Sequence, residues 1–157
     1  LILQQISLDS QFSLSKSLIM IQRIQSVYLL LVVIACVAYI FVPFGLVKNP
    51  DGTLETWAIK QVVPIMIAAI VIAVIAFASI FLFNNRKNQM KVVLVNIVLS
   101  VMLIGLFLFG LTQHIGIQNY IFKIGAILPI FILLFNMLAY GSIKSDEALV
   151  KSMDRLR

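Results

Sequence analysis

The chain has 157 residues, of which 62% are hydrophobic and 11% charged, and its mean hydropathy is +1.09. A composition this apolar excludes an ordinary soluble domain. The formal net charge of +6 would fit a nucleic-acid partner, but Lys and Arg stand in short stretches beside long apolar runs. Membrane topology and contact with anionic lipid head groups explain that placement, so no nucleic-acid partner is expected.

Residues 1–19 are rich in Ser and Gln and differ from the rest of the chain. Met20 opens a segment that leads directly into the first apolar run. We therefore expect translation to start at Met20 and residues 1–19 to be non-native or disordered. A signal peptide with Arg23 as its basic end is the alternative, but its apolar core would be too long and no small-residue cleavage site precedes Pro43.

Four long apolar runs, none with an acidic residue, dominate the rest of the chain: Val27–Phe44, Val62–Phe83, Val92–Leu111 and Ile121–Tyr140. A bilayer core of about 30 Å needs about 20 apolar residues of helix. Backbone polar groups in lipid must be paired, which favours helices for unbroken runs of this length. The sequence therefore predicts an all-α integral membrane protein, with one domain over residues 20–157 that forms a four-helix bundle in up-down-up-down order.

Basic residues are distributed unequally between the two sides of the predicted bundle. The side with both termini and the second loop collects nine: Lys16, Arg23, Arg86, Lys87, Lys91, Lys144, Lys151, Arg155 and Arg157. The other side has Lys48 and Lys60, and a third if Lys123 reaches outward from the start of the last run. The positive-inside rule then places both termini in the cytoplasm.

Residue sets that carry catalysis or bind metals are missing from the sequence. The six acidic residues all lie outside the apolar runs: Asp9, Asp51, Glu55, Asp146, Glu147 and Asp154. The single Cys36 offers no Cys-x-x-Cys pair, and His114 has no second metal ligand near it in the sequence. Paired carboxylates, a Ser-His-Asp set and a glycine-rich phosphate loop are also absent. We therefore expect no enzyme activity, no metal and no cofactor.

Neutral polar residues inside the runs are the remaining candidates for a site: Ser79, Asn96, Ser100 and Asn136. Asn96 and Ser100 are four residues apart and share one helix face. In the predicted topology all four lie about one turn from the cytoplasmic edge and form one interhelical polar layer. The layer either clamps helices together, at about 0.6 kcal/mol per hydrogen bond, or binds a ligand or ion. We prefer the clamp because no charge accompanies the amides.

Small residues and prolines mark where helices approach or bend. Ala69, Ala73 and Ala76 recur at helical spacing and allow close packing within the bundle, while a homodimer through such a face is the alternative. Pro129 stands in the middle of the last run, where it predicts a kink.

Two segments outside the runs are distinctive. In the first loop, Trp57 follows an Asn-Pro-Asp-Gly turn signal and predicts an interfacial anchor at the outer leaflet, with stacking on a ligand as the alternative. Residues 145–157 predict a short amphipathic helix on the cytoplasmic side. Ser145 would be its N-cap, and Asp146 and Glu147 would favour its dipole.

Three segments of the chain resemble a known family: Met20–Leu31, Asn85–Lys91 and Asp146–Arg157. In order and spacing they are similar to DUF4293, a domain of unknown function from Bacteroidota, and the resemblance covers Met20–Arg157. It implies a four-span protein of the bacterial inner membrane and supplies no activity. All three segments are cytoplasmic or juxtamembrane in the predicted topology, which indicates that any shared task is performed on the cytoplasmic face.

The expected function is that of a non-enzymatic membrane scaffold or accessory subunit with a membrane or cytoplasmic protein partner. Its docking or lipid-contact surface is expected to comprise Arg23, Arg86, Lys87, Lys91, Lys151, Arg155 and Arg157. The simpler interpretation is that these charges only orient the spans and contact anionic lipid. The alternative function is a small transporter or channel for a neutral or lipid-like solute, with Asn96, Ser100 and Asn136 along its path and Pro129 as a hinge.

Overall fold

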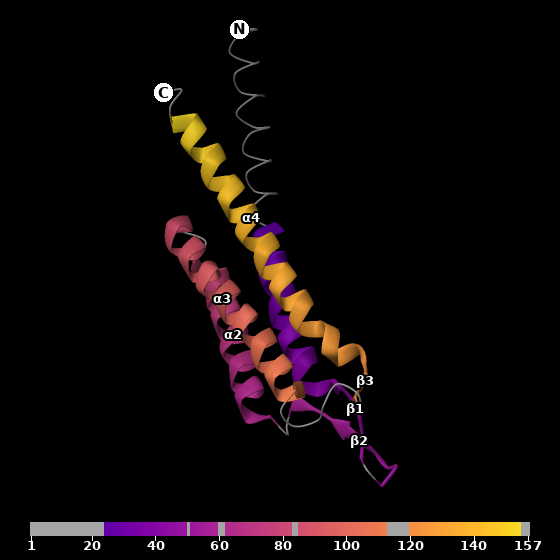
Figure 1. Ribbon diagram of the computed structural model, residues 1–157. Helices are drawn as coiled ribbons and strands as arrows, with labels where there is room; N and C mark the ends of the chain where they lie inside the picture. Colours follow the sequence, from indigo (N-terminus) through magenta and orange to yellow (C-terminus); the bar gives the residue numbers. More distant parts are fainter. Residues whose placement is uncertain (1–23, 50, 60–61, 83–84, 113–119, 155–157) are drawn as a thin grey trace, which may run out of the picture.

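A computed structural model describes residues 24–49, 51–59, 62–82, 85–112 and 120–154 (Figure 1). Within them, four helices are long and apolar enough to cross a membrane, which confirms the prediction of a mostly helical membrane protein. The predictions for residues 1–19 and for four single residues lie outside the described residues: Arg23, His114, Arg155 and Arg157.

The helices follow the four apolar runs in order but differ from them at the ends. The first helix is Ile24–Phe41, α2 is Val63–Phe81 and α3 is Arg86–Gly110. The last begins as a 3₁₀ turn, η5 (Ile124–Ile127), and continues into α4 (Leu128–Asp154). α3 packs against both α2 and α4.

Two polar segments that the sequence places outside the spans are helical. α3 begins at Arg86, so residues 86–91 of the predicted loop form its first turns, with the Asn85 side chain as N-cap. α4 continues unbroken to Asp154, so residues 145–154 extend the last span and are not a separate tail helix with its own cap at Ser145. No proline interrupts this stretch, and the fully buried Ile143 holds it on the bundle.

The predicted kink at Pro129 is wrong. Pro129 is the second residue of α4, which follows the tighter 3₁₀ turn of η5. A proline is tolerated in the first turn of a helix, because the N–H that it lacks would be unpaired there in any case. The apolar run therefore does not form one continuous α-helix, since its first residues build other structure.

A small sheet at one end of the bundle is absent from the sequence-based prediction. β1 (Gly45–Lys48) pairs antiparallel with β2 (Leu54–Trp57) on one side and with β3 (Tyr120–Phe122) on the other. The Lys123 N–H also donates to the Phe44 carbonyl (2.9 Å), so the start of the last helix is fixed to the end of the first. We call this the sheet end, and the opposite end, where α3 begins and α4 ends, the basic end.

The buried side chains of the helices follow a seven-residue repeat, with alternating steps of four and three. In α2 they are Ile65, Ala69, Ile72, Ala76 and Ser79, and in α3 they are Gln89, Val93, Asn96, Ser100, Leu103, Phe107 and Gly110. This spacing of about 3.5 residues is that of helices packed in a left-handed supercoil. Large apolar side chains such as Val74 and Phe109 are exposed on the outside, as suits a surface that faces lipid. We call the buried faces of the helices, taken together, the seam.

Candidate functional site

Three of the predicted polar-layer residues form a hydrogen-bonded network between α3 and α4. Asn96 Nδ2 donates to Asn136 Oδ1 (3.1 Å), and Asn136 Nδ2 donates to Ser100 Oγ (3.0 Å). Ser100 Oγ in turn donates to the Asn96 backbone carbonyl, one turn earlier on its own helix (2.8 Å). All three side chains are 0% exposed, so the network is enclosed between the two helices.

Ser79 takes part in a different contact. Its Oγ donates to the Ile75 carbonyl of its own helix (2.8 Å), and its backbone carbonyl accepts a hydrogen bond from Gln89 Nε2 (3.0 Å). Gln89 lies two turns before Asn96 on α3, toward the basic end. The polar residues thus form two separate sets of hydrogen bonds along the seam. One set joins α2 to α3, and the other joins α3 to α4.

The Trp57 side chain, predicted as an interfacial anchor, is buried inside the protein at the sheet end. Its side chain is 6% exposed and its ring centroid is 5.4 to 5.7 Å from those of Phe44, Phe107 and Tyr120. The indole also lies beside Gly110 at the end of α3. Burial raises the pKa of Tyr120 to about 12, so its phenol stays neutral at physiological pH. The cluster joins the sheet to the helices.

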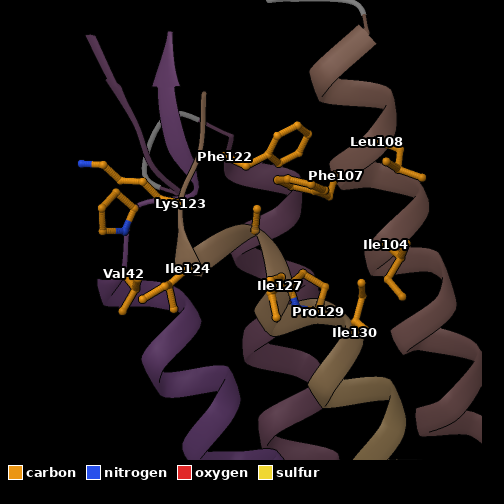
Figure 2. A pocket seen from close by; sticks show the side chains of 12 residues that line it. Val42, Ile104, Phe107, Leu108, Phe122, Lys123, Ile124, Ile127, Pro129 and Ile130 are labelled. Atoms are coloured by element: carbon orange, nitrogen blue, oxygen red, sulfur yellow. The ribbon is translucent and has the colours of Figure 1, made fainter. Parts of the chain in front are cut away.

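An apolar cavity opens at the sheet end between α3 and the start of the last helix (Figure 2). Its volume is about 860 Å³. Its walls include Ile104 and Leu108 from α3 and Ile127 and Ile130 from the last helix, and Lys123 is the charged residue at its edge. The sequence carried no signal for this cavity, because residues far apart in the chain form it.

Three further polar residues are buried at the basic end of the seam: Gln25, Gln89 and Asp146. In the described part of the chain, Gln25 Nε2, Gln89 Oε1 and both carboxyl oxygens of Asp146 have no hydrogen-bond partner. The predicted role of Asp146 at the N-terminus of a tail helix is wrong, because α4 has no terminus there. The seven-residue repeat would have revealed its burial, since it continues the series of Ile132, Asn136, Ala139 and Ile143.

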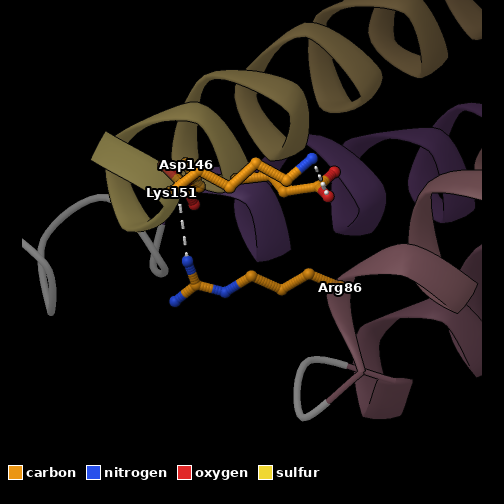
Figure 3. A network of polar contacts seen from close by, with 4 residues as sticks. Arg86, Asp146 and Lys151 are labelled. Carbon is orange, nitrogen blue, oxygen red and sulfur yellow. Dashed lines mark hydrogen bonds and ion pairs between the residues drawn. The ribbon is translucent and has the colours of Figure 1, made fainter. Parts of the chain in front are cut away.

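Arg86, predicted as part of the docking surface, turns toward Asp146. Its Nη1 donates to the Asp146 backbone carbonyl at 3.5 Å, a long hydrogen bond, and Figure 3 shows the guanidinium reaching across to α4. A positive guanidinium beside a buried carboxyl group is electrostatically favourable. This contact therefore holds the beginning of α3 beside α4, close to where the bundle ends.

Exposed lysines at the basic end come from two helices: Lys87, Lys91, Lys144 and Lys151. Lys151 Nζ pairs with Glu147 Oε1 (2.9 Å), one turn earlier on α4 (Figure 3). α3 contains no acidic residue, so Lys87 and Lys91 present two positive charges on one face of the helix without a neutralising neighbour on it. Lys144, which the sequence analysis left out of the docking set, lies at the same end.

The chain was compared with known families, curated proteins and solved structures. Residues 21–156 match the model of a family described as Domain of unknown function (DUF4293), which confirms the resemblance seen in three segments. The search of curated proteins and the search of solved structures found no match. Within the described residues, no three His, Cys, Asp or Glu side chains gather closely enough to hold a metal ion.

Proposed function

The chain belongs to the DUF4293 family, and we propose that it is a non-enzymatic scaffold or accessory subunit of a bacterial inner membrane. In this proposal both termini face the cytoplasm and the basic end of the bundle is the docking surface. The partner is a membrane or cytoplasmic protein with an acidic face. The observation that carries the proposal is the extension of α4 beyond the described parts of α2 and α3.

That extension follows from where α3 and α4 meet. Arg86 is the first residue of α3 and contacts Asp146, whereas α4 continues to Asp154. At about 1.5 Å per residue, the remaining part of α4 projects by about 12 Å. Figure 1 shows this end of α4 extending past α2 and α3. Among the described residues, this projecting helix presents more surface to a protein partner than a bundle whose helices all end at one level would.

The surface of the basic end supports the same proposal. Lys87 and Lys91 lie on α3 and Lys144 lies on α4, all exposed, and Leu149 on the projecting part is 46% exposed. Positive charge beside an exposed apolar side chain fits a protein partner of complementary charge. The simpler alternative is that the lysines contact only anionic lipid, at about 1 kcal/mol each.

Charge reversal at Lys87 and Lys91 tests the proposal. We expect the Lys87→Glu/Lys91→Glu protein to insert into the membrane and to lose the proteins that cross-link to the wild-type chain and co-purify with it from native membranes. Lys48→Glu, at an exposed position on β1 at the sheet end, is the control and should keep them. If the doubly reversed protein inserts normally and its cross-linked partners are unchanged, the docking proposal is wrong.

The alternative proposal, a small transporter or channel for a neutral or lipid-like solute, has less support. Asn96, Ser100 and Asn136 would line its path, but they hydrogen-bond one another and are fully buried. Pro129, the proposed hinge, lies in the first turn of α4, where it does not interrupt the helix. The enclosed network therefore favours a packing role for these residues.

A further inference from the structure

We propose that the cavity at the sheet end binds one phospholipid with an anionic head group. An acyl chain would occupy the cavity between α3 and the last helix, and the phosphate would lie at Lys123. This inference concerns the opposite end of the bundle from the docking surface and does not depend on the proposed function.

The cavity has the volume and apolar lining of a ligand site and is open on one side, because Leu108, Ile127 and Ile130 are each more than half exposed. Its volume of about 860 Å³ lies within the range of about 300–1,000 Å³ that small-molecule sites occupy. Ile104, Leu108, Ile127 and Ile130 give it apolar walls, as Figure 2 shows. These residues belong to helices of membrane-spanning length, so the molecule available to fill the space in a bilayer is an acyl chain. Filling it restores the van der Waals contacts that the walls otherwise lack.

Backbone contacts fix the start of the last helix, which forms one wall of the cavity. β3 pairs with β1, and Gly125 in η5 lies so close to the Pro43 carbonyl that a Cβ there would overlap it. Both contacts hold the start of the last helix against the end of the first helix. The space between α3 and the start of the last helix is lined by Leu108 and Ile127. The cavity thus lies beside a part of the fold that these contacts hold in place.

Charge at the edge of the cavity selects the head group. Lys123 is the single charged residue among those that line the cavity, and it forms no ion pair with the described residues. In Figure 2 the Lys123 side chain extends away from Ile104 and Leu108, on the side of Val42 and Ile124, and its ammonium group is clear of the apolar walls. A lysine at the end of a span can reach the head groups through its flexible stem. The helix that starts at Ile124 adds the positive end of its dipole on the same side. An apolar cavity with a cation at its edge fits an amphiphile with a negative head.

Native mass spectrometry of the full chain, purified in a mild detergent, tests this proposal. Phosphatidylglycerol and phosphatidylcholine with identical chains are the two probes, because they differ in head-group charge alone. We expect one phosphatidylglycerol to be retained more tightly than phosphatidylcholine. One lysine near a membrane surface corresponds to a preference of about fivefold. Lys123→Gln should abolish this preference and Lys123→Arg should preserve it.

Two further variants separate a built site from general lipid contact. Leu108→Trp fills the cavity and should release both lipids, while Lys48→Gln, an exposed lysine on β1 that does not line the cavity, should leave the preference unchanged. A helical circular dichroism spectrum checks that each variant is folded. Equal retention of both lipids, or a preference that survives in folded Lys123→Gln protein, overturns the proposal. A dimer that forms in place of the lipid complex and is lost in Leu108→Trp would assign the cavity to a second copy of the chain and also overturn it.

Discussion

Asn136 shows how single polar residues act in this bundle. Its amide is the central link of the network, because it accepts from Asn96 and donates to Ser100. Asn96 Oδ1 has no partner among the described residues, so the network is not fully satisfied. A buried amide that loses its partner is costly, whereas removing both partners together can be nearly neutral. The contribution of each residue to stability therefore depends on whether its hydrogen-bond partner is present.

Asn136→Leu should destabilise the association of α3 and α4 by about 1–2 kcal/mol, because Asn96 and Ser100 lose their partner. The Asn96→Leu/Asn136→Leu protein should lose less than the sum of the two single variants. Unfolding in detergent micelles measures all three, and Asn88→Leu, at an exposed amide on α3, is the matched control. Additive costs would contradict the direct coupling.

Uptake of small solutes should be unchanged in Asn136→Leu, and its loss would favour the transporter.

Among the elements, the helices and the sheet obey different constraints. The helices pack through a seven-residue repeat of buried side chains, and in α2 large and small ones alternate, as Ile72 and Ala76 do. The sheet instead depends on close approach between strands. A Cβ at Gly45 would overlap the Tyr120 ring and the Ile121 carbonyl of β3, whereas one at Gly105 in α3 would meet no atom within 4 Å. The two glycines therefore have different roles.

Gly45→Ala should lower the stability of the protein by about 1–3 kcal/mol, because β1 has to move away from β3 to accommodate the methyl group. Gly105→Ala should leave stability unchanged or raise it by up to about 1 kcal/mol, since alanine restricts the unfolded chain more than glycine does. Thermal unfolding in one detergent compares the two proteins. Similar midpoints for both variants would show that the contact between β1 and β3 is not tight.

At the scale of the whole molecule, the two ends of the bundle differ in architecture and charge. The sheet end ties the first and last helices together through β1 and β3, while the basic end carries exposed lysines and the projecting part of α4. Such asymmetry gives each side of the membrane a different surface. In the proposed orientation, which follows the positive-inside rule, the basic end faces the cytoplasm.

Reporter fusions should therefore give opposite results at the two ends. A reporter after Arg157 is expected to be active only as a cytoplasmic fusion, and one inserted at Gly52, in the exposed turn between β1 and β2, only outside the cytoplasm. Gly52 has φ of 77° and no neighbour within 4 Å of its Cβ position, so the insertion leaves the packed core untouched. The reverse pattern of activity would invert the bundle and move the docking surface to the other side.

The sequence by itself determined the membrane character of the protein and its four helices, because long apolar runs have few alternatives in lipid. It also placed Asn96, Ser100 and Asn136 at related depths, since helix periodicity and the order of the runs are local information. The ends of the helices were harder to predict from the sequence. Residues 86–91 and 145–154 are polar, and only their position on the bundle decides that they are helical.

Tertiary structure alone decided the sheet, the burial of Trp57 and Asp146, and the cavity beside Lys123. β1 and β3 are separated by about half the chain, and no local pattern in a three-residue strand such as Tyr120–Phe122 identifies its partner. The sequence around Trp57 does not show that its ring packs against Phe44, Phe107 and Tyr120. Burial depends on which distant residues meet, because local sequence fixes only the face of an element and the packing of the whole chain fixes what covers that face.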